Sequence, residues 1–468
     1  MASSLFARLP VMSRRLLDKP SRKRLSLFFL LIAGVTGGAG AAVIMIQVTR
    51  PLRLIQKAWP SAASSESLRD ATSISQTPVA PTANRPFPQN LNYPGCIKPN
   101  NVTQTDINNS IKDYYSYWKS AYVRASNGVT PGGGYYIFAK GTGGSGNEET
   151  TSEAHGYGMI IFALMAGYDS QAKQRFDGMF NMFDKHRSMN NPDNMSWVID
   201  KSELPSKDAG DATDGDMDIA YALLLAHYQW GSNGEINYLA QARRLIRNGI
   251  KESNMSLTTK RALLGGWSTD QYATRVSDWM IDHFEAFREA TDDSFWDDAT
   301  KTVYDLINQI NAKYSPETGL APDFVIGHPA RPAPPKFLEA ETDNDYSWNS
   351  CRYPWRLATA FAHYGAPETR SATNKVVKWL KKKTNGDPGN IKAGYTLDGK
   401  QLASYRSLAF TSPFTAACIV DKSHQAYLNA GWNTIKNWRE DYYGDTLNLL
   451  CMLLISGDWW APISHAPS

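Results

Sequence analysis

Residues 212–230 read "ATDGDMDIAYALLLAHYQW" and pose the central question of this sequence. The residues that follow Asp218 are almost all apolar, which predicts a helix buried on every side. Yet Asp214, Asp216 and Asp218 crowd the start of that helix. An unpaired carboxylate that leaves water costs several kcal/mol, or it takes up a proton instead. These carboxylates must therefore be held by partners or serve in chemistry.

The composition is that of a globular protein with a mildly acidic body. The chain has 468 residues, 42% of them hydrophobic, enough for one large domain or two ordinary ones. Its formal net charge is +4, but ten Lys and Arg residues and one acid lie within the first 60 residues, which leaves the remainder at −5. No basic stripe appears beyond "KWLKKK" at 378–383, which is typical of a solvated helix end. The sequence therefore argues against nucleic acid as a partner.

An uncharged run at residues 25–49 follows a basic N-terminal segment, residues 1–24. The run is long enough to span a bilayer, and the basic flank predicts a cytosolic N-terminus. We therefore expect a single-pass membrane protein with its folded domain outside the cytosol. A cleaved signal peptide that ends near Ala41 is the alternative and would make the protein secreted.

The next segment, residues 50–92, is rich in Ser, Ala, Pro and Thr and predicts a disordered linker. The folded domain is expected over 93–468. Its four cysteines form no C-x-x-C motif and no spacing typical of zinc, so one or two disulfides of undefined pairing are the expectation. They are Cys96, Cys351, Cys418 and Cys451.

Helical periodicity dominates this domain and predicts twelve helices. They span about 105–125, 153–168, 170–187, 215–231, 235–253, 276–290, 293–313, 350–364, 366–383, 405–420, 424–439 and 442–456. Twelve successive helices with mostly short loops favour six hairpins that close into an inner and an outer ring. The helices that are apolar all round, such as 157–166 and 217–226, would form the inner ring. An irregular helical bundle is the alternative that helix counting leaves open.

A further acidic residue, Glu153, stands immediately before another apolar helix. One interpretation is structural, because Thr150 and Glu153 have the spacing of a capping box and the aspartates complement a helix dipole. The other follows from position: parallel inner helices begin at one mouth of the ring, so Glu153 and Asp214 would converge on one cleft. Hydrolysis of a glycosidic bond requires such a pair, one carboxyl group protonated and one ionised.

Several segments resemble glycoside hydrolase family 8, in the family's order. Residues 212–230 resemble its signature segment, and "SEAHGYGM" (152–159) is similar to its proton-donor segment. The other similar segments are "TRVSDWMIDHFEAF" (274–287), "NSCRYPWR" (349–356) and "YYGDTLNLLCMLLISGDWW" (442–460). The likeness spans roughly residues 95–462. The resemblance implies an all-α fold, an (α/α)6 barrel of twelve helices. It also implies an enzyme that hydrolyses β-1,4-linked glycans with inversion.

The resemblance also implies roles for individual residues. Glu153 matches the general acid, and Asp214 matches a residue that binds and distorts the sugar ring. Asn349 departs from the best-known branch of the family, where an aspartate at this position is the general base, because an amide cannot take up a proton. A second branch, typically chitosanases and mixed-linkage β-glucanases, is similar in having Asn here and a loop glutamate as base. In this chain Glu339 is the expected base and Glu341 the second choice.

The acidic loop and the remaining polar residues have structural alternatives. The loop could be a solvated turn, or a weak calcium site at Asp343 and Asp345. Arg275 and Asp278 could shape the cleft through an ion pair, and Arg352 could orient carboxylates. Aromatic side chains in loops could stack on sugar rings, although each could equally serve packing. They are Trp197, Trp267, Tyr272 and Trp348.

The sequence as a whole predicts an inverting endo-acting hydrolase, chitosanase-like first and endo-β-1,4- or endo-β-1,3-1,4-glucanase-like second. Its partner would be a polysaccharide, chitosan or a β-glucan, and the membrane if residues 25–49 are retained. No metal and no cofactor is expected, since no cluster of metal-binding spacing appears. A catalytically silent protein that binds glycans or anchors to the cell wall is the alternative from another class. A helical-barrel polysaccharide lyase is a third option.

Overall fold

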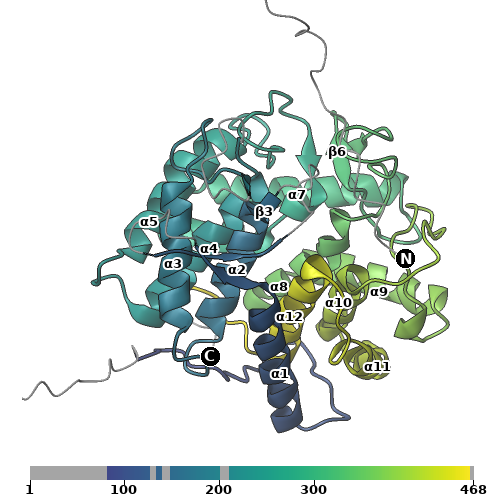
Figure 1. Ribbon diagram of the computed structural model, residues 1–468. Helices are drawn as coiled ribbons and strands as arrows, with labels where there is room; N and C mark the ends of the chain where they lie inside the picture. Colours follow the sequence, from purple (N-terminus) through teal and green to yellow (C-terminus); the bar gives the residue numbers. More distant parts are fainter. Residues whose placement is uncertain (1–81, 127–132, 140–147, 201–209, 464–468) are drawn as a thin grey trace, which may run out of the picture. The chain divides into compact units, whose positions relative to one another are not determined.

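The computed structural model describes residues 82–126, 133–139, 148–200 and 210–463, which contain twelve α-helices (Figure 1). They are α1 (Gln104–Tyr122), α2 (Ser152–Leu164), α3 (Ala172–Lys185), α4 (Thr213–Trp230), α5 (Tyr238–Arg244), α6 (Ile281–Thr291), α7 (Phe295–Lys313), α8 (Tyr353–Tyr364), α9 (Pro367–Lys383), α10 (Leu408–Ala417), α11 (Gln425–Ile435) and α12 (Tyr442–Ser456). Each helix overlaps one of the twelve predicted ranges. The fifth range is split, because a π-helical segment, Leu245–Asn254, continues α5.

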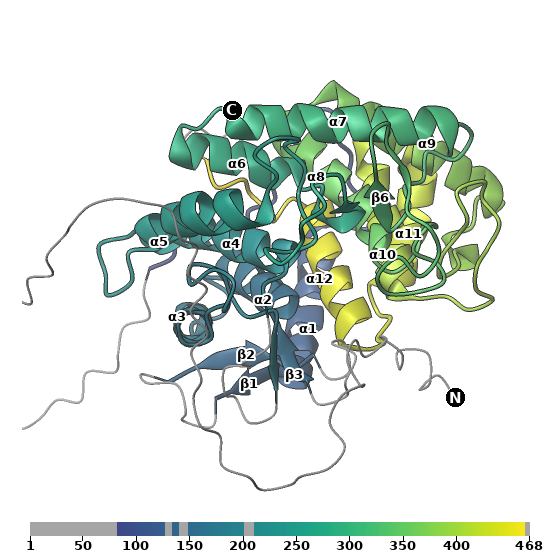
Figure 2. The ribbon, with the colours of Figure 1, turned by 90° about the horizontal axis from the view of Figure 1, so that it is seen from above.

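The even-numbered helices form a closed inner ring. Each of α2, α4, α6, α8 and α10 packs against the next, and α12 packs against α2 to close the circle. Each odd-numbered helix packs on the outside of an inner one: α1 on α12, α3 on α2, α5 on α4, α7 on α6, α9 on α8 and α11 on α10. Figure 2 shows α7 and α6, and α3 and α2, as such outer and inner neighbours. The predicted (α/α)6 barrel is confirmed, and the irregular bundle is wrong.

The burial of the helices explains the two rings. In α2 every residue except Glu153 is buried, whereas α7 buries one stripe that includes Trp296, Val303 and Ile310. The inner helices α2 and α4 approach closely where each carries a glycine. A Cβ atom built at Gly215 would lie 2.2 Å from Oγ of Ser152, so only glycine fits there.

Short antiparallel strands form three small sheets among the described residues, and two of these sheets contain a strand that leads into an inner helix. They are β1 (Val123–Ala125) with β2 (Tyr135–Ile137), β3 (Glu148–Thr151) with β4 (Val198–Asp200), and β5 (Thr274–Arg275) with β6 (Phe324–Ile326) and β7 (Arg331–Pro332). Strand β3 runs directly into α2, and β5 is followed by a 3₁₀ turn, Val276–Asp278, ahead of α6. The loops at this end of the barrel are therefore braced by paired backbone.

The folded domain begins before Tyr93, so the predicted boundary at residue 93 is too late. The backbone N–H of Asn84 donates to the carbonyl of Gln229 (3.0 Å), and that of Leu91 donates to the carbonyl of Gly457 (2.7 Å). Phe87 is buried against the helical core. Residues 82–92 therefore belong to the domain and not to a linker. The segments expected at 1–24 and 25–49, and the linker up to residue 81, lie outside the described residues.

The expectation of a single-pass membrane protein is corrected by the helices themselves. Within 82–126, 133–139, 148–200 and 210–463, no helix combines the length and the apolar character needed to cross a bilayer. The run at 25–49, on which the expectation depended, lies outside these ranges. The expected disulfides are not formed either, because all four cysteines are free thiols.

Candidate active site

Arg352 lies at the centre of the acidic cluster at the N-terminal ends of the inner helices. It ends the 3₁₀ turn Ser350–Arg352 that precedes α8, and its side chain is only 2% exposed. Its Nη1 donates to Oε2 of Glu153 (2.7 Å) and to Oδ2 of Asp214 (2.9 Å). The starts of α2, α4 and α8 therefore meet at one place. Parallel inner helices bring together two acids that are far apart in the sequence, as expected from the barrel.

The three aspartates of α4 have three different partners. Asp214 pairs with Arg352, as described. Asp216 is fully buried and accepts from the backbone N–H of Met195 (2.8 Å) and from Nδ2 of Asn254 (3.1 Å), so it ties one loop and the end of the π-helical segment to α4. Asp218 serves the core, as described next. Of the three, only Asp214 reaches the acidic cluster.

Asp218 pairs with groups from two other inner helices. Both of its oxygens accept from Arg356 of α8 (3.0 and 2.7 Å), and Nε2 of His283 in α6 lies 2.7 Å from Oδ1. Arg352 and Arg356 are one helical turn apart, as are Asp214 and Asp218. The two arginine–aspartate pairs therefore lie one helical turn apart and fix α8 against α4.

Glu153 is a partly exposed carboxyl group and not a helix cap. The N-cap of α2 is Thr151, whose hydroxyl accepts from the N–H of Ala154, so the capping box expected from Thr150 is wrong. The Glu153 side chain is 18% exposed and binds Arg352 and, at 3.5 Å, the hydroxyl of Tyr442. Burial raises the pKa of Glu153 to about 7; the charge of Arg352 opposes the rise and that of Asp214 adds to it. Such a carboxyl group keeps its proton close to neutral pH, as a general acid must.

Glu339 lies on the other side of the same cluster. Its Oε1 accepts from Nη2 of Arg275 (2.7 Å) and its Oε2 from Nδ2 of Asn349 (2.8 Å), and its side chain is 33% exposed. The Oδ1 atom of Asn349 in turn accepts from Nη2 of Arg352 (3.2 Å). A continuous polar chain therefore runs from Glu153 through Arg352 and Asn349 to Glu339. Glu341 has no part in it: this side chain is 67% exposed and pairs with Lys336.

The loop that carries Glu339 is not a calcium site. Asp343 is buried, and its carboxylate accepts from three backbone N–H groups of residues 338–340. In the part of the chain that the structure describes, no three His, Cys, Asp or Glu side chains are grouped as a metal site. The loop is therefore held by hydrogen bonds between its own backbone and the Asp343 carboxylate.

Arg275 and Asp278 do not form the expected ion pair, because Arg275 directs its guanidinium to Glu339. Asp278 accepts instead from the hydroxyl of Ser277 (2.7 Å). Burial, together with the nearby charge of Asp214, raises the pKa of Asp278 to about 7, and Arg275 opposes the rise. Asp278 thus limits the net charge of the cluster without entering the polar chain.

The four expected aromatic residues differ in exposure. Trp267 (47% exposed) and Tyr272 (41% exposed) belong to one loop, and the Tyr272 ring stacks on His328 with centroids 6.1 Å apart. Trp197 and Trp348 are half-buried, and the Trp348 ring packs edge-on against Phe410 at 5.1 Å. The Tyr272 ring is also contacted by the guanidinium of Arg261 (5.3 Å), so Trp267 is the more accessible of the two rings. Stacking by any of the four stays a prediction.

Two tyrosines of the cluster were not predicted as site residues from the sequence. The hydroxyl of Tyr442, in the first turn of α12, contacts Glu153, and that of Tyr157 in α2 accepts from Arg352 at 3.1 Å. Their positions in the sequence could have identified these tyrosines, because both lie in the first two turns of inner helices. Such helix starts face the same mouth as the acids.

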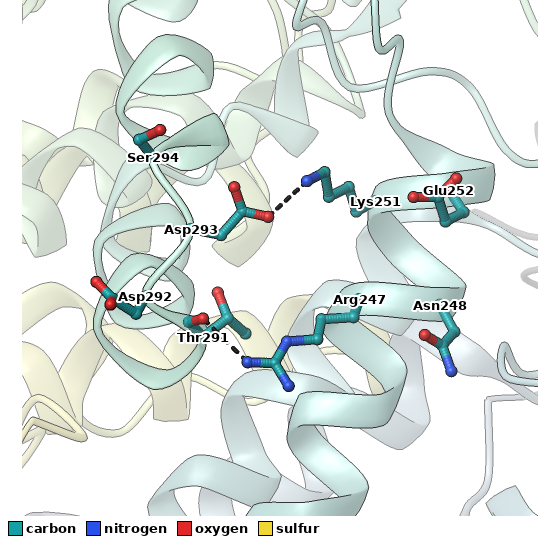
Figure 3. A pocket seen from close by; sticks show the side chains of 8 residues that line it. All are labelled: Arg247, Asn248, Lys251, Glu252, Thr291, Asp292, Asp293 and Ser294. Atoms are coloured by element: carbon teal, nitrogen blue, oxygen red, sulfur yellow. Dashed lines mark hydrogen bonds and ion pairs between the residues drawn. The ribbon is translucent and has the colours of Figure 1, made fainter.

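A surface hollow elsewhere carries none of these residues. Figure 3 shows it between the π-helical segment Leu245–Asn254 and the turn after α6. Lys251 pairs with Asp293 across it (2.5 Å), and Arg247 donates to the carbonyl of Thr291 (3.0 Å). These charged groups satisfy one another, so we assign no function to the hollow.

Comparisons with known proteins identify the family of this chain. The model of the glycosyl hydrolases family 8 matches residues 98–457. An endoglucanase of Bacillus sp. (strain KSM-330) is 42% identical over 84% of this chain and 85% of its own, and a beta-glucanase of Niallia circulans is 42% identical over 81% and 91%.

Solved structures have the same fold. The apo structure of a beta-1,3-1,4-glucanase from Paenibacillus sp. X4 superposes with a TM-score of 0.77 at 41% identity, over 81% of this chain and 99% of that one. A xylobiose complex from Teredinibacter turnerae, at 18% identity over 77% and 96% with a TM-score of 0.66, shows the fold alone. The protein therefore belongs to the glycosyl hydrolases family 8 and is a glycoside hydrolase.

Proposed function

We propose that the protein is an inverting, endo-acting hydrolase of β-1,4-linked glucans in which Glu153 is the general acid and Glu339 the general base. The polar chain from Glu153 through Arg352 and Asn349 to Glu339 carries this proposal. Two side chains separate the two carboxyl groups. Inverting enzymes need two carboxyl groups that are held apart, typically by about 6.5–9.5 Å, to leave room for a water molecule.

The proposed reaction moves two protons, one donated by Glu153 and one accepted by Glu339. Glu153 donates its proton to the glycosidic oxygen while the bond from that oxygen to the anomeric carbon breaks. Glu339 accepts a proton from water, whose oxygen bonds to the anomeric carbon on the opposite face. The new reducing end has the α configuration. Asp214, held by Arg352, binds the sugar ring at the cleavage point.

Glu339 is better suited than Glu341 to the role of base. Its carboxylate is oriented by Arg275 and Asn349 and is one-third exposed, so water can reach it. A base must lie within hydrogen-bond reach of the water that it activates. Glu341 faces solvent beside Lys336. Asn349 then does not indicate a dead enzyme, because the protein supplies a base from the neighbouring loop.

A mixed-linkage or cellulose-like β-glucan is the substrate class that we favour. The two relatives at 42% identity are named endoglucanase and beta-glucanase, and the structure at 41% identity is a beta-1,3-1,4-glucanase. Chitosan is the second candidate. With Glu153 and Asp278 holding their protons near neutral pH, the carboxylates of Asp214 and Glu339 are balanced by Arg352 and Arg275, so the cluster itself gives a polycation no advantage over a neutral glucan.

Release of reducing ends from barley β-glucan, carboxymethyl-cellulose and chitosan tests the proposal. We expect the highest rate on a glucan, and a loss of about 10²–10⁴ in kcat for Glu153→Gln and for Glu339→Gln. Glu341→Gln is the matched control and should stay within about twofold, because an exposed side chain remote from the reacting bond adds little. Binding without hydrolysis of any of the three would favour a silent glycan-binding protein. A product that absorbs in the ultraviolet would indicate a lyase.

A further inference from the structure

The loop that carries Glu339 is folded around one buried carboxylate. Oδ2 of Asp343 accepts from the backbone N–H groups of Leu338 (2.7 Å) and Glu339 (2.9 Å), and Oδ1 accepts from that of Ala340 (2.8 Å). The Asp343 side chain is fully buried. Three consecutive backbone N–H groups therefore donate to one carboxylate, and the middle N–H is that of Glu339 itself.

The same residue fixes the loop to the barrel. The carbonyl oxygen of Asp343 accepts from the N–H of Phe324 in β6 (3.1 Å), and β6 pairs with β5, which contains Arg275. Arg275 is the residue that binds Oε1 of Glu339. The backbone of Glu339 and the guanidinium that orients its carboxylate are thus joined through Asp343 and two strands.

The loop has a shape that it would not adopt unaided. Lys336 has a φ of 57°, in the left-handed region that a residue with a side chain seldom occupies. The N–H of Lys336 donates to the carbonyl of Ala340 (2.8 Å), which closes the turn around the carboxylate. Hydrogen bonds to an ionised acceptor are stronger than those between neutral groups, so the carboxylate of Asp343 opposes the cost of this conformation.

We propose that Asp343 is a positioning residue for the general base: its carboxylate holds the backbone of residues 338–340 so that the Glu339 side chain stays between Arg275 and Asn349. This inference rests on the proposed role of Glu339. A displacement of about 1 Å in a catalytic group can lower the rate about 10²-fold, so a loop that moves by that distance would disable the base. Binding of the glycan through Asp214 and the aromatic residues would be retained.

Asp343→Asn is the direct test, because it keeps the shape of the side chain but turns one acceptor oxygen into an N–H donor that faces a backbone N–H. We expect kcat to fall about 10- to 100-fold while KM changes less than about threefold. Asp345→Asn, in the same loop, and Glu341→Gln are the matched controls, and both should keep the wild-type kcat. A rise in KM with an unchanged kcat would overturn the proposal. Should Asp343→Asn not fold, Asp343→Ser, which keeps a neutral acceptor, carries the same test.

A second measurement separates positioning of the base from a general structural role. In Glu339→Ala, azide attacks the anomeric carbon without any base, forming an α-glycosyl azide while Glu153 protonates the leaving oxygen. If Asp343 acts only through Glu339, adding Asp343→Asn to Glu339→Ala leaves the azide reaction within about twofold, because the two changes are not additive. A further tenfold loss would overturn the positioning role.

The two proposals fail in different ways. If Glu339→Gln keeps wild-type activity, the assignment of the base is wrong, whatever Asp343→Asn does. If Glu339→Gln is inactive but Asp343→Asn has wild-type kcat, only the positioning role of Asp343 falls.

Discussion

The amide of Asn349 donates from Nδ2 to Oε2 of Glu339 at 2.8 Å, and its oxygen accepts from Arg352 at 3.2 Å. An amide can serve both neighbours at once, because it offers a donor to the carboxylate and an acceptor to the guanidinium. An aspartate at position 349 would instead place two carboxylates in contact. Asparagine is therefore the residue whose hydrogen-bonding groups match both the carboxylate of Glu339 and the guanidinium of Arg352.

The first prediction concerns Asn349→Asp. Two carboxylates in contact share a proton, so the apparent pKa of the pair rises. The acid limb of the profile of kcat/KM against pH should move upward by about one unit or more, and activity at pH 5 should fall at least tenfold. The check is the pH profile of both proteins on the same glucan. An unchanged acid limb would contradict the contact between residues 349 and 339.

The pH dependence of the wild-type enzyme provides the second prediction. In the proposed mechanism the acid form of Glu153 is the active one, and the pKa of Glu153 is raised to about 7 by burial, with Arg352 opposing the rise. The rate should therefore decline as the pH rises through about 7, tenfold per unit at higher pH. A plateau up to pH 9 would show that another group supplies the proton.

Stability should follow the same titration. The folded-state pKa of Glu153, about 7, exceeds its ordinary value of 4.5. The carboxyl group therefore contributes stability fully below pH 4.5 and loses that contribution as the pH rises through 7. Glu153→Gln cannot ionise, so its melting temperature relative to wild type should increase from pH 4 to pH 8. A difference that is constant or that shrinks would contradict the raised pKa.

Removal of Arg352 should destabilise the barrel as well as the site. Arg352→Met leaves the carboxyl groups of Glu153 and Asp214 side by side without their shared cation. Breaking a buried ion pair in this way costs about 3–5 kcal/mol in the free energy of unfolding. Lys301→Met removes a pair with Asp298 in which both side chains are exposed (73% and 55%), and it should cost no more than about 1 kcal/mol. Urea unfolding of the three proteins provides the comparison, and equal costs would contradict the central place of Arg352.

The close approach of α2 and α4 can be tested through Gly215. A methyl group there would meet the backbone and side chain of Ser152, so Gly215→Ala should cost about 1–3 kcal/mol by overpacking and should lower kcat as Asp214 moves. Gly234→Ala is the matched control, since a Cβ at Gly234 meets nothing within 4 Å. Thermal melting and kcat measured on both variants decide the matter. A neutral Gly215→Ala would mean that the two helices are less tightly packed.

Much of the fold was predictable because the signals are local and strong. Apolar faces with helical periodicity predict helices, and alternation of inner and outer helices predicts a ring in which Glu153 and Asp214 meet. The choice among polar partners was not predictable, because it depends on distances of a few ångströms between loops. Arg275 binds Glu339 and not Asp278 for that reason. The helix cap at Thr151 instead of Thr150 is a shift of one residue, which a spacing pattern alone cannot resolve.

The anomeric form of the first product tests the central claim most directly. Proton NMR during hydrolysis of a mixed-linkage β-glucan distinguishes the two anomers before they equilibrate. If Glu153 and Glu339 act from opposite faces of the sugar, the α anomer appears first and the β anomer grows in later. Early appearance of the β anomer would mean that a carboxylate attacks the sugar itself, and the assignment of Glu339 as a base for water would be wrong.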